Sequence, residues 1–401
     1  MKTVLLLLLV GMFHLSGTDS TLVSKRPDGR QVSTYAIVRD MLKQTEPACE
    51  YKPGMSKKEF RKWQKEVSAS MAELMKHPDV KGQPAPVMVS SAKRDGYTLQ
   101  RWESYPLPGA VSPFLVMIPD GVDAAHPAPA ILCIPGSGVP KESLACEPDV
   151  KTPDKPRTFN PKYAMGLDYV KEGYIAVCVD NAATGEAADQ EKGWENDDVL
   201  PSRFLLELGW SWLGYTSFFD MKVLQWMKTQ PYMRQDRLVV SGFSLGTEPM
   251  MVLGALDKDI YAFVYNDFLC QTQERAIVET AIDKNGFRHF PNSIRHLIPD
   301  YWHSFNFIDV VASFAPRHLI FVEGGLDRDF DLVKDAYRTA GAPEAVKCIH
   351  YAKFQDPAPR NRVLPVEDGI DNMTFLGMAN VDPRNHYFKY EYVLPWLKEI
   401  L

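Results

Sequence analysis

The sequence predicts an α/β fold with a mainly parallel central sheet flanked by helices. Short apolar runs alternate with helical segments, as is typical of parallel strands joined by crossover helices. The runs are apolar throughout, so both faces of each strand need cover by helices. In chain order, the runs are residues 130–134, 174–179, 238–240, 260–264, 318–322 and 346–351.

The composition is that of a globular protein. The 401 residues include 45 Lys and Arg against 51 Asp and Glu, which gives a formal charge of −6, and 45% are hydrophobic. The chain has no long run of Lys or Arg, and so offers no electrostatic footprint for a phosphate backbone or anionic lipid. We therefore expect no nucleic-acid partner.

Residues 1–20 have the parts of a secretory signal peptide. Lys2 gives a positive start, residues 4–13 are apolar or small, and small residues follow. The apolar run is too short to span a bilayer, and no later stretch is long and apolar enough to do so. We expect a secreted or periplasmic protein without stable membrane insertion.

The rest of the chain divides into a helical N-terminal extension, residues 21–84, and a catalytic domain, residues 85–401. Residues 97–103 and 114–118 are short apolar segments around Pro-Gly turns, and they predict an antiparallel pair at a sheet edge. Phe219, Val223, Trp226 and Met227 follow helical spacing, which indicates core packing.

Two long segments lack clear periodicity. Residues 267–316 and 352–385 are irregular and rich in Pro, Asn and aromatic residues. We interpret them as insertions over one edge of the sheet, where loops at the carboxyl ends of parallel strands form a ligand crevice.

The six cysteines do not predict a disulfide framework or a metal site. Cys133, Cys178, Cys270 and Cys348 lie in or beside apolar runs, where cysteine is usually a small buried hydrophobe. No C-x-x-C pair is present, so a structural zinc site is not expected. Nothing in the sequence calls for a cofactor.

The sharpest signal is Gly242-Phe-Ser244-Leu-Gly246, between an apolar strand and a helical segment. Such a turn holds a serine hydroxyl out from the backbone, where a carbonyl carbon can reach it. The glycines avoid clashes between the crossing strand and helix. The alternative is an ordinary strand-to-helix turn with a capping serine.

A serine nucleophile needs a base, and His386 is the histidine we favour. It is the last histidine, and in a parallel-sheet hydrolase the order along the chain is Ser, acid, His. His350 lies in an expected strand and is interpreted as a core group. His289, His296 and His303 are seven residues apart, but Pro291 and Pro299 break any helix that would align them as metal ligands.

The third member must be a carboxylate that orients the imidazole and stabilises the imidazolium. Asp327 is favoured because it follows the strand at 318–322 on a Gly-rich turn. Glu323, Asp329 and Asp267 remain open as alternatives, and Asp327 could instead cap the following helix.

Donors for an oxyanion are expected from two places. The N–H of Leu245 follows the nucleophile at a helix start, where the helix dipole favours negative charge. The loop Gly136-Ser137-Gly138 follows another strand and could supply a second donor, although it could also be a simple turn. It lacks the G-x-x-x-x-G-K-[ST] pattern of a phosphate loop.

Three further residues are candidates for substrate contact. Trp302 and His303 could line a pocket, and Glu186 follows the strand at 174–179 near the expected crevice. A structural role is equally open for each, since aromatic residues at such density are often helix packing.

Four motifs carry a resemblance to a known family: the Gly136-Ser-Gly138 loop, the Ser244 motif, Ala315-Pro-Arg317 before Glu-Gly-Gly-Leu-Asp327, and Asn385-His386-Tyr-Phe. Through them, the chain resembles secreted α/β-hydrolases of the acetyl-xylan-esterase-like and dienelactone-hydrolase-like group. The resemblance covers roughly residues 85–401. It implies an α/β-hydrolase fold, with Ser244 as nucleophile, His386 as base and an acid in the Asp327 loop. It also implies esterase activity on acylated plant glycans, and hence a small-molecule or carbohydrate ester substrate.

The chain departs from this group in two ways. Pro135 stands where esterases commonly have His before the glycine, and Ser244 stands where dienelactone hydrolases usually have cysteine. The serine favours ester or amide substrates. A serine peptidase of similar fold and a catalytically inactive glycan-binding protein remain alternatives, and the sequence leaves the oligomeric state open.

Overall fold

The computed structural model describes residues 24, 26, 28, 30–157, 159–289, 293–360 and 369–401. The signal peptide expected at residues 1–20 lies outside the described residues. The chain divides into two compact units after Thr45. In the first, helix α1 (Thr34–Gln44) is capped by Ser33, whose side chain accepts a hydrogen bond from the N–H of Ala36. The second unit, Glu46–Leu401, contains the sheet and every predicted site residue.

The described residues form a nine-stranded sheet in the order β1-β2-β3-β5-β4-β6-β7-β8-β9. Its strands are β1 (Val87–Arg94), β2 (Tyr97–Ser104), β3 (Ser112–Pro119), β4 (Ala128–Ile134), β5 (Ile175–Val179), β6 (Met233–Phe243), β7 (Ala262–Asn266), β8 (His318–Phe321) and β9 (Val346–Cys348). β4 to β9 are parallel to one another, whereas β1, β2 and β3 are antiparallel at one edge. All six predicted inner strands and the antiparallel edge pair are therefore confirmed. β9 ends before His350, so His350 lies in a loop and not in a strand.

Fourteen α-helices are described, with short 3-10 turns between them. The helices after α1 are α2 (Lys57–Met75), α3 (Lys141–Ala145), α4 (Met165–Lys171), α5 (Val199–Glu207), α6 (Trp212–Met227), α7 (Thr247–Leu256), α8 (Thr272–Glu279), α9 (Tyr301–Ser304), α10 (Phe307–Ala312), α11 (Asp327–Ala340), α12 (Pro357–Arg360), α13 (Asn372–Met378) and α14 (Tyr390–Ile400). Of these, α8, α9, α10, α12 and α13 lie in the segments expected to be irregular. They are four to eight residues long, too short to give a clear helical period in the sequence.

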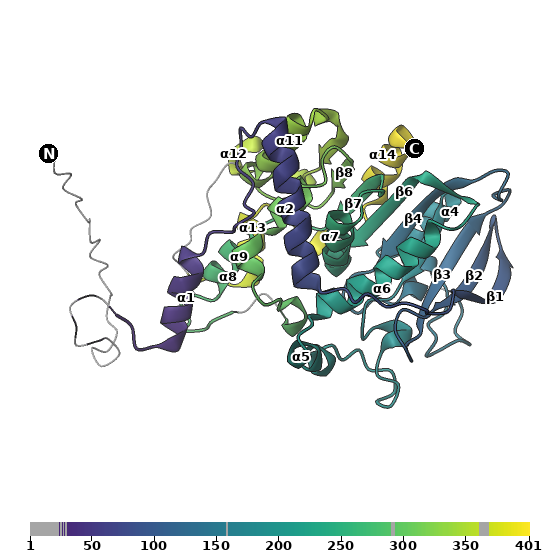
Figure 1. Ribbon diagram of the computed structural model, residues 1–401, viewed down its shortest axis with the longest axis horizontal. Coiled ribbons are helices and arrows are strands. Elements are labelled where there is room, and N and C mark those ends of the chain that lie inside the picture. Colours follow the sequence, from purple (N-terminus) through teal and green to yellow (C-terminus); the bar gives the residue numbers. More distant parts are fainter. Residues whose placement is uncertain are drawn as a thin grey trace. The chain divides into compact units, whose positions relative to one another are not determined.

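Helices cover both faces of the sheet, as the continuous apolar runs predict. Alternate strand residues point to opposite faces. Leu132 of β4 packs in a core with residues of α2, α6, α7, α10 and α11, whereas Ile131 and Cys133 pack in a second core with α3, α4 and α14. Figure 1 shows α2, α6 and α7 together on one side of the sheet.

Helix α2, in the second unit, packs into the core on one face of the sheet. Ser56 and Glu59 form a capping box at its start. Five apolar residues then recur at helical spacing and are buried in the larger core. They are Phe60, Trp63, Val67, Met71 and Met75. The indole of Trp63 also donates to the carbonyl of Cys49 at 2.8 Å.

The cysteines are all free thiols, and five of the six are buried. In the described part of the chain, no helix is both long enough and apolar enough to cross a bilayer.

Candidate active site

Ser244 sits at a sharp turn where β6 passes into α7. Its φ of +52° is in the left-handed region, which costs energy for a residue with a side chain. A Cβ on Gly242 would lie 2.5 Å from the carbonyl oxygen of Gly246, and one on Gly246 would lie 2.8 Å from that of Pro135. Strand and helix therefore cross as closely as the Gly-x-Ser-x-Gly pattern indicates. The turn holds Ser244 half-buried at the carboxyl end of β6.

The glycine loop after β4 lies beside this serine. A Cβ on Gly136 would be 3.3 Å from the Cβ of Ser244 and 3.0 Å from the ring of Phe243. The side-chain amide of Asn181 donates to the carbonyl of Pro135 at 2.7 Å and holds the loop in place. Ser137 and Gly138 are exposed, whereas Leu245, which follows the nucleophile, is buried. The structure thus brings both predicted sources of oxyanion donors to the region of Ser244.

His386 lies between a 3-10 turn (Pro383–Asn385) and α14, in the last loop of the chain. Its ring stacks on that of Phe243, with centroids 4.8 Å apart and planes at 22°. Phe243 is the last residue of β6 and the immediate chain neighbour of Ser244, so the imidazole lies near the end of β6, where the serine turn begins. Asn266, at the end of β7, fixes this loop by donating to the carbonyl of Tyr387 and accepting from the N–H of Lys389.

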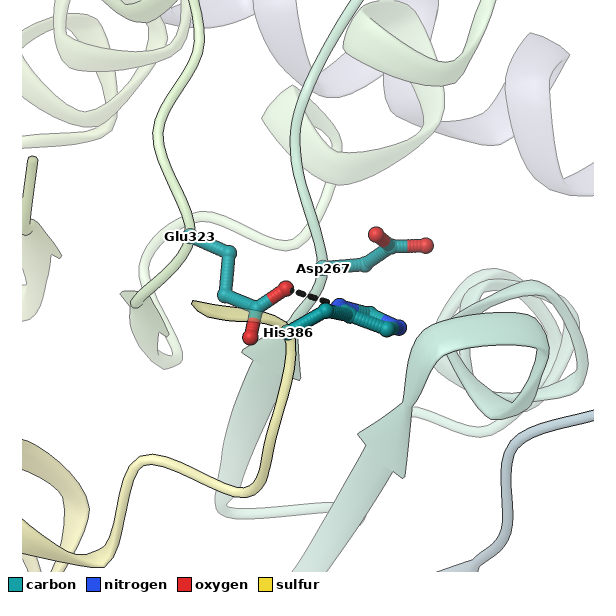
Figure 2. Close-up of side chains that lie close together, drawn as sticks. All are labelled: Asp267, Glu323 and His386. Carbon is teal, nitrogen blue, oxygen red and sulfur yellow. Dashed lines mark hydrogen bonds and ion pairs between the residues drawn. The ribbon is translucent and has the colours of Figure 1, made fainter. Parts of the chain in front are cut away.

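The carboxylate partner of His386 is Glu323. Its Oε2 forms a hydrogen bond with Nδ1 of the imidazole (Figure 2), and its side chain is fully buried. The other oxygen, Oε1, accepts from the N–H of Tyr387 at 3.2 Å and lies 3.5 Å from Nζ of Lys389. Glu323 is thus positioned to fix the imidazole orientation and to stabilise its charged form.

The sequence favoured Asp327 as the acid, and this geometry corrects that prediction: the carboxylate bonded to His386 is Glu323. Asp327 begins α11, and its carboxylate binds Nε of Arg360 at 3.1 and 3.2 Å. Its Oδ1 also lies 3.3 Å from Nε2 of His350. Glu323 comes only two residues after β8 and has the longer side chain, so it reaches the imidazole. Asp329 pairs instead with Arg328.

A second carboxylate, Asp267, lies near the same imidazole (Figure 2). One oxygen of Asp267, one of Glu323 and a ring nitrogen of His386 all lie within 4.8 Å of one another. Burial raises the pKa of Asp267 to about 7, against the opposing charge of His386. Burial alone would lower the pKa of His386, but the hydrogen bond and charge of Glu323 and the charge of Asp267 outweigh it and raise that pKa.

These three residues are the one group among the described residues whose donor atoms could together hold a metal ion. Nδ1 of His386 and both oxygens of Glu323 are already paired within the protein. The arrangement therefore fits a charge-paired imidazole better than an ion. His289, His296 and His303 each pair with a different carboxylate and do not share a site.

The predicted substrate-contact residues each have a partner outside this arrangement. Trp302 donates to the hydroxyl of Thr272 at 3.2 Å. His303 pairs with Asp300 at 2.8 Å on an exposed surface. Glu186 binds Nζ of Lys141. Among the described residues, no hydrogen bond or ion pair joins any of them to Glu323 or His386.

Lys141 is a residue that the sequence analysis missed. It lies three residues after Gly138, is fully buried, and contacts three carboxylates: Glu186, Asp180 at 2.8 Å and Glu142 at 3.1 Å. Burial alone would lower the pKa of Lys141, but the three negative charges outweigh it and raise that pKa. Its backbone N–H also donates to Asp180 at 2.7 Å, so this ion cluster anchors the far end of the Gly136 loop.

Comparisons with known proteins agree with this architecture. The chain matches an abhydrolase family over residues 15–399. A Bacteroides fragilis protein of known structure, provisionally described as an acetyl xylan esterase, is 57% identical, with a TM-score of 0.88 over 94% of this chain and 97% of that one. A methylesterase is 16% identical, with a TM-score of 0.55 over 83% of this chain and 66% of that one, and so shows a shared fold alone. No curated protein matches the chain.

Proposed function

The chain belongs to the abhydrolase family and is a carboxylic ester hydrolase, and we propose that it removes acetyl groups from polysaccharides or oligosaccharides by a Ser244, His386 and Glu323 mechanism. The 57% identical relative, described as an acetyl xylan esterase, supports the substrate class. One observation carries the mechanism: an imidazole bound to a buried carboxylate stacks on the residue next to a serine at a strained turn.

The reaction follows from these positions. His386 Nε2 takes the proton of Ser244 as its Oγ attacks the ester carbonyl carbon. Glu323, on the other ring nitrogen, stabilises the imidazolium. The N–H of Leu245 and the Gly136–Gly138 loop stabilise the oxyanion. His386 then gives its proton to the leaving sugar hydroxyl, and the ester of Ser244 remains. Water, deprotonated by His386, attacks this ester and releases acetate and free Ser244.

We also propose that the protein is exported. Residues 1–20 carry the features of a secretory leader, and a polymeric glycan outside the cell would then be accessible. Fractionation of cells that produce the full chain tests this proposal. Detection of the protein only in the cytoplasm would contradict it.

The enzymatic proposal is tested with acetylated xylo-oligosaccharides, feruloylated glycans, methyl uronates and p-nitrophenyl acetate. We expect the highest kcat/KM on an acetylated oligosaccharide. Ser244→Ala should lower kcat on every active substrate by about a thousandfold or more. Ser91→Ala, at an exposed serine of β1, is the matched control and should behave as the parent. A folded Ser244→Ala protein with the parent's kcat would refute the mechanism, and a preference for another ester would refute only the substrate class.

A further inference from the structure

A groove of about 540 Å³ lies between the antiparallel edge of the sheet and the end of α6. This volume is in the range of small-molecule sites in proteins. We call it the β2–α6 groove. The lining residues that bear on binding are Gln83, Trp102, Tyr105, Lys222, Gln225 and Trp226.

The β2–α6 groove is separate from the candidate active site. β2 and β6 are four strand spacings apart in the sheet order, which corresponds to about 19 Å at about 4.8 Å per spacing. None of the lining residues takes part in the arrangement around Ser244 and His386. A ligand in the groove would therefore not occupy the reacting centre.

Aromatic rings form the apolar part of the groove. The rings of Trp102 and Trp226 lie with centroids 4.9 Å apart at 55°, and the ring of Tyr105 also lines the groove. Trp102 is stacked on Phe114 with planes at 20°, and Trp226 also contacts Phe114. The indoles are therefore held rigidly, so little side-chain entropy is lost when a flat apolar face packs on them. A pyranose ring presents such a face through its C–H groups.

The polar part of the groove is nearly uncharged. Three carboxamides line it, from Gln83, Gln225 and Gln230. The Nε2 of Gln230 already donates to the carbonyl of Trp226 at 3.2 Å and to the hydroxyl of Thr229 at 2.9 Å, so only its oxygen is offered to a ligand. Among the described residues, the amides of Gln83 and Gln225 have no hydrogen-bond partner in the protein. Lys222 is the single charged residue in the lining. Neutral amides beside aromatic rings match vicinal hydroxyl groups, whereas a phosphate or a polyuronate would require several cations.

We propose that the β2–α6 groove is a second, non-catalytic binding site for a neutral glycan chain. The inference rests on the groove's lining and does not depend on the reaction proposed above. If the polymer bound there also carries the esters that the enzyme hydrolyses, the groove raises their effective concentration near Ser244.

Calorimetric titration with unesterified xylohexaose and cellohexaose tests this proposal, since neither sugar contains an ester to be hydrolysed. We expect the parent to bind at least one of them. The double variant Gln83→Ala/Gln225→Ala, which removes the two lining amides without a partner in the described part of the protein, should bind it about tenfold more weakly. Its hydrolysis of p-nitrophenyl acetate and its Tm should remain those of the parent. Gln355→Ala, at an exposed glutamine elsewhere, is the matched control.

Tyr105→Ala provides an independent variant on a different element, and it should weaken binding in the same direction. Unchanged affinity in both groove variants would overturn the proposal, because any observed binding would then belong elsewhere. Absence of binding of either hexaose to the parent would overturn it too. A third result would also overturn the proposal. The parent would bind inorganic phosphate or polygalacturonate and not the neutral sugars, and the double variant would lose that binding.

Discussion

Replacement of Glu323 with glutamine tests which carboxylate supports His386. Glutamine keeps the size of the side chain but removes the charge that faces Nδ1. An ion pair at about 4 Å contributes about 4 kcal/mol at the effective dielectric of a protein site. Loss of that stabilisation when the imidazolium forms corresponds to about a thousandfold in kcat. A glutamine N–H could also donate to Nδ1 and force the ring proton onto Nε2, which would then not accept a proton from Ser244.

The assay is steady-state hydrolysis of p-nitrophenyl acetate and of an acetylated oligosaccharide, together with the Tm of each protein. We expect Glu323→Gln to lose kcat while it remains folded. Asp327→Asn is the matched control, because it removes a carboxylate that binds Arg360 and not His386. It should lower Tm and leave kcat close to the parent's. A normal kcat in Glu323→Gln, or a loss of similar size in Asp327→Asn, would refute the assignment.

Three further predictions concern protonation, loop support and the tight turn. His386 must be neutral to act as the base, and its surroundings together raise its pKa. The acidic limb of the pH profile of kcat/KM should therefore lie above the ordinary histidine pKa of about 6.5. Glu323→Gln should move that limb to lower pH, and a limb that stays in place would contradict this. Lys141→Met leaves buried carboxylates without their cation and should cost about 3 to 5 kcal/mol in urea unfolding, with a lower kcat in whatever protein remains folded. An unchanged free energy of unfolding would show that the cluster does not support the loop. Gly246→Ala places a methyl group against the carbonyl oxygens of Ile134 and Pro135, so yield and Tm should both fall. A variant with the parent's Tm and kcat would show that the turn tolerates a side chain.

The strands and the serine turn could be predicted because their signals are local. Each inner strand is a short apolar run, and the Gly-x-Ser-x-Gly pattern contains the residues whose close approach the turn requires. Chain order singled out His386 as the candidate base. Its carboxylate partner could not be predicted, because Gly324 and Gly325 have φ values of +83° and +140°, and these values set the path of the loop beyond Glu323. Without that path, the sequence favoured Asp327, four residues after Glu323, and left Glu323, Asp329 and Asp267 as alternatives.

Features made by long-range packing left little signal in the sequence. Two of the three carboxylate partners of Lys141, Asp180 and Glu186, lie 39 and 45 residues away along the chain. The two indoles of the β2–α6 groove come from strand and helix segments more than a hundred residues apart. Helical spacing placed Trp226 in the core, and it is indeed only 7% exposed, but spacing alone does not reveal that Trp226 also lines a groove.

Peptide mapping of the acyl-enzyme tests the central claim most directly. The protein is mixed with p-nitrophenyl acetate, quenched in acid during turnover, digested and analysed by mass spectrometry. We predict a single acetyl group on the peptide that contains Ser244. This acetylated peptide should be absent from the Ser244→Ala protein. It should accumulate in Glu323→Gln if deacylation becomes the slower step. An acetyl group on a different residue, or rapid turnover with no covalent adduct on Ser244, would contradict the account.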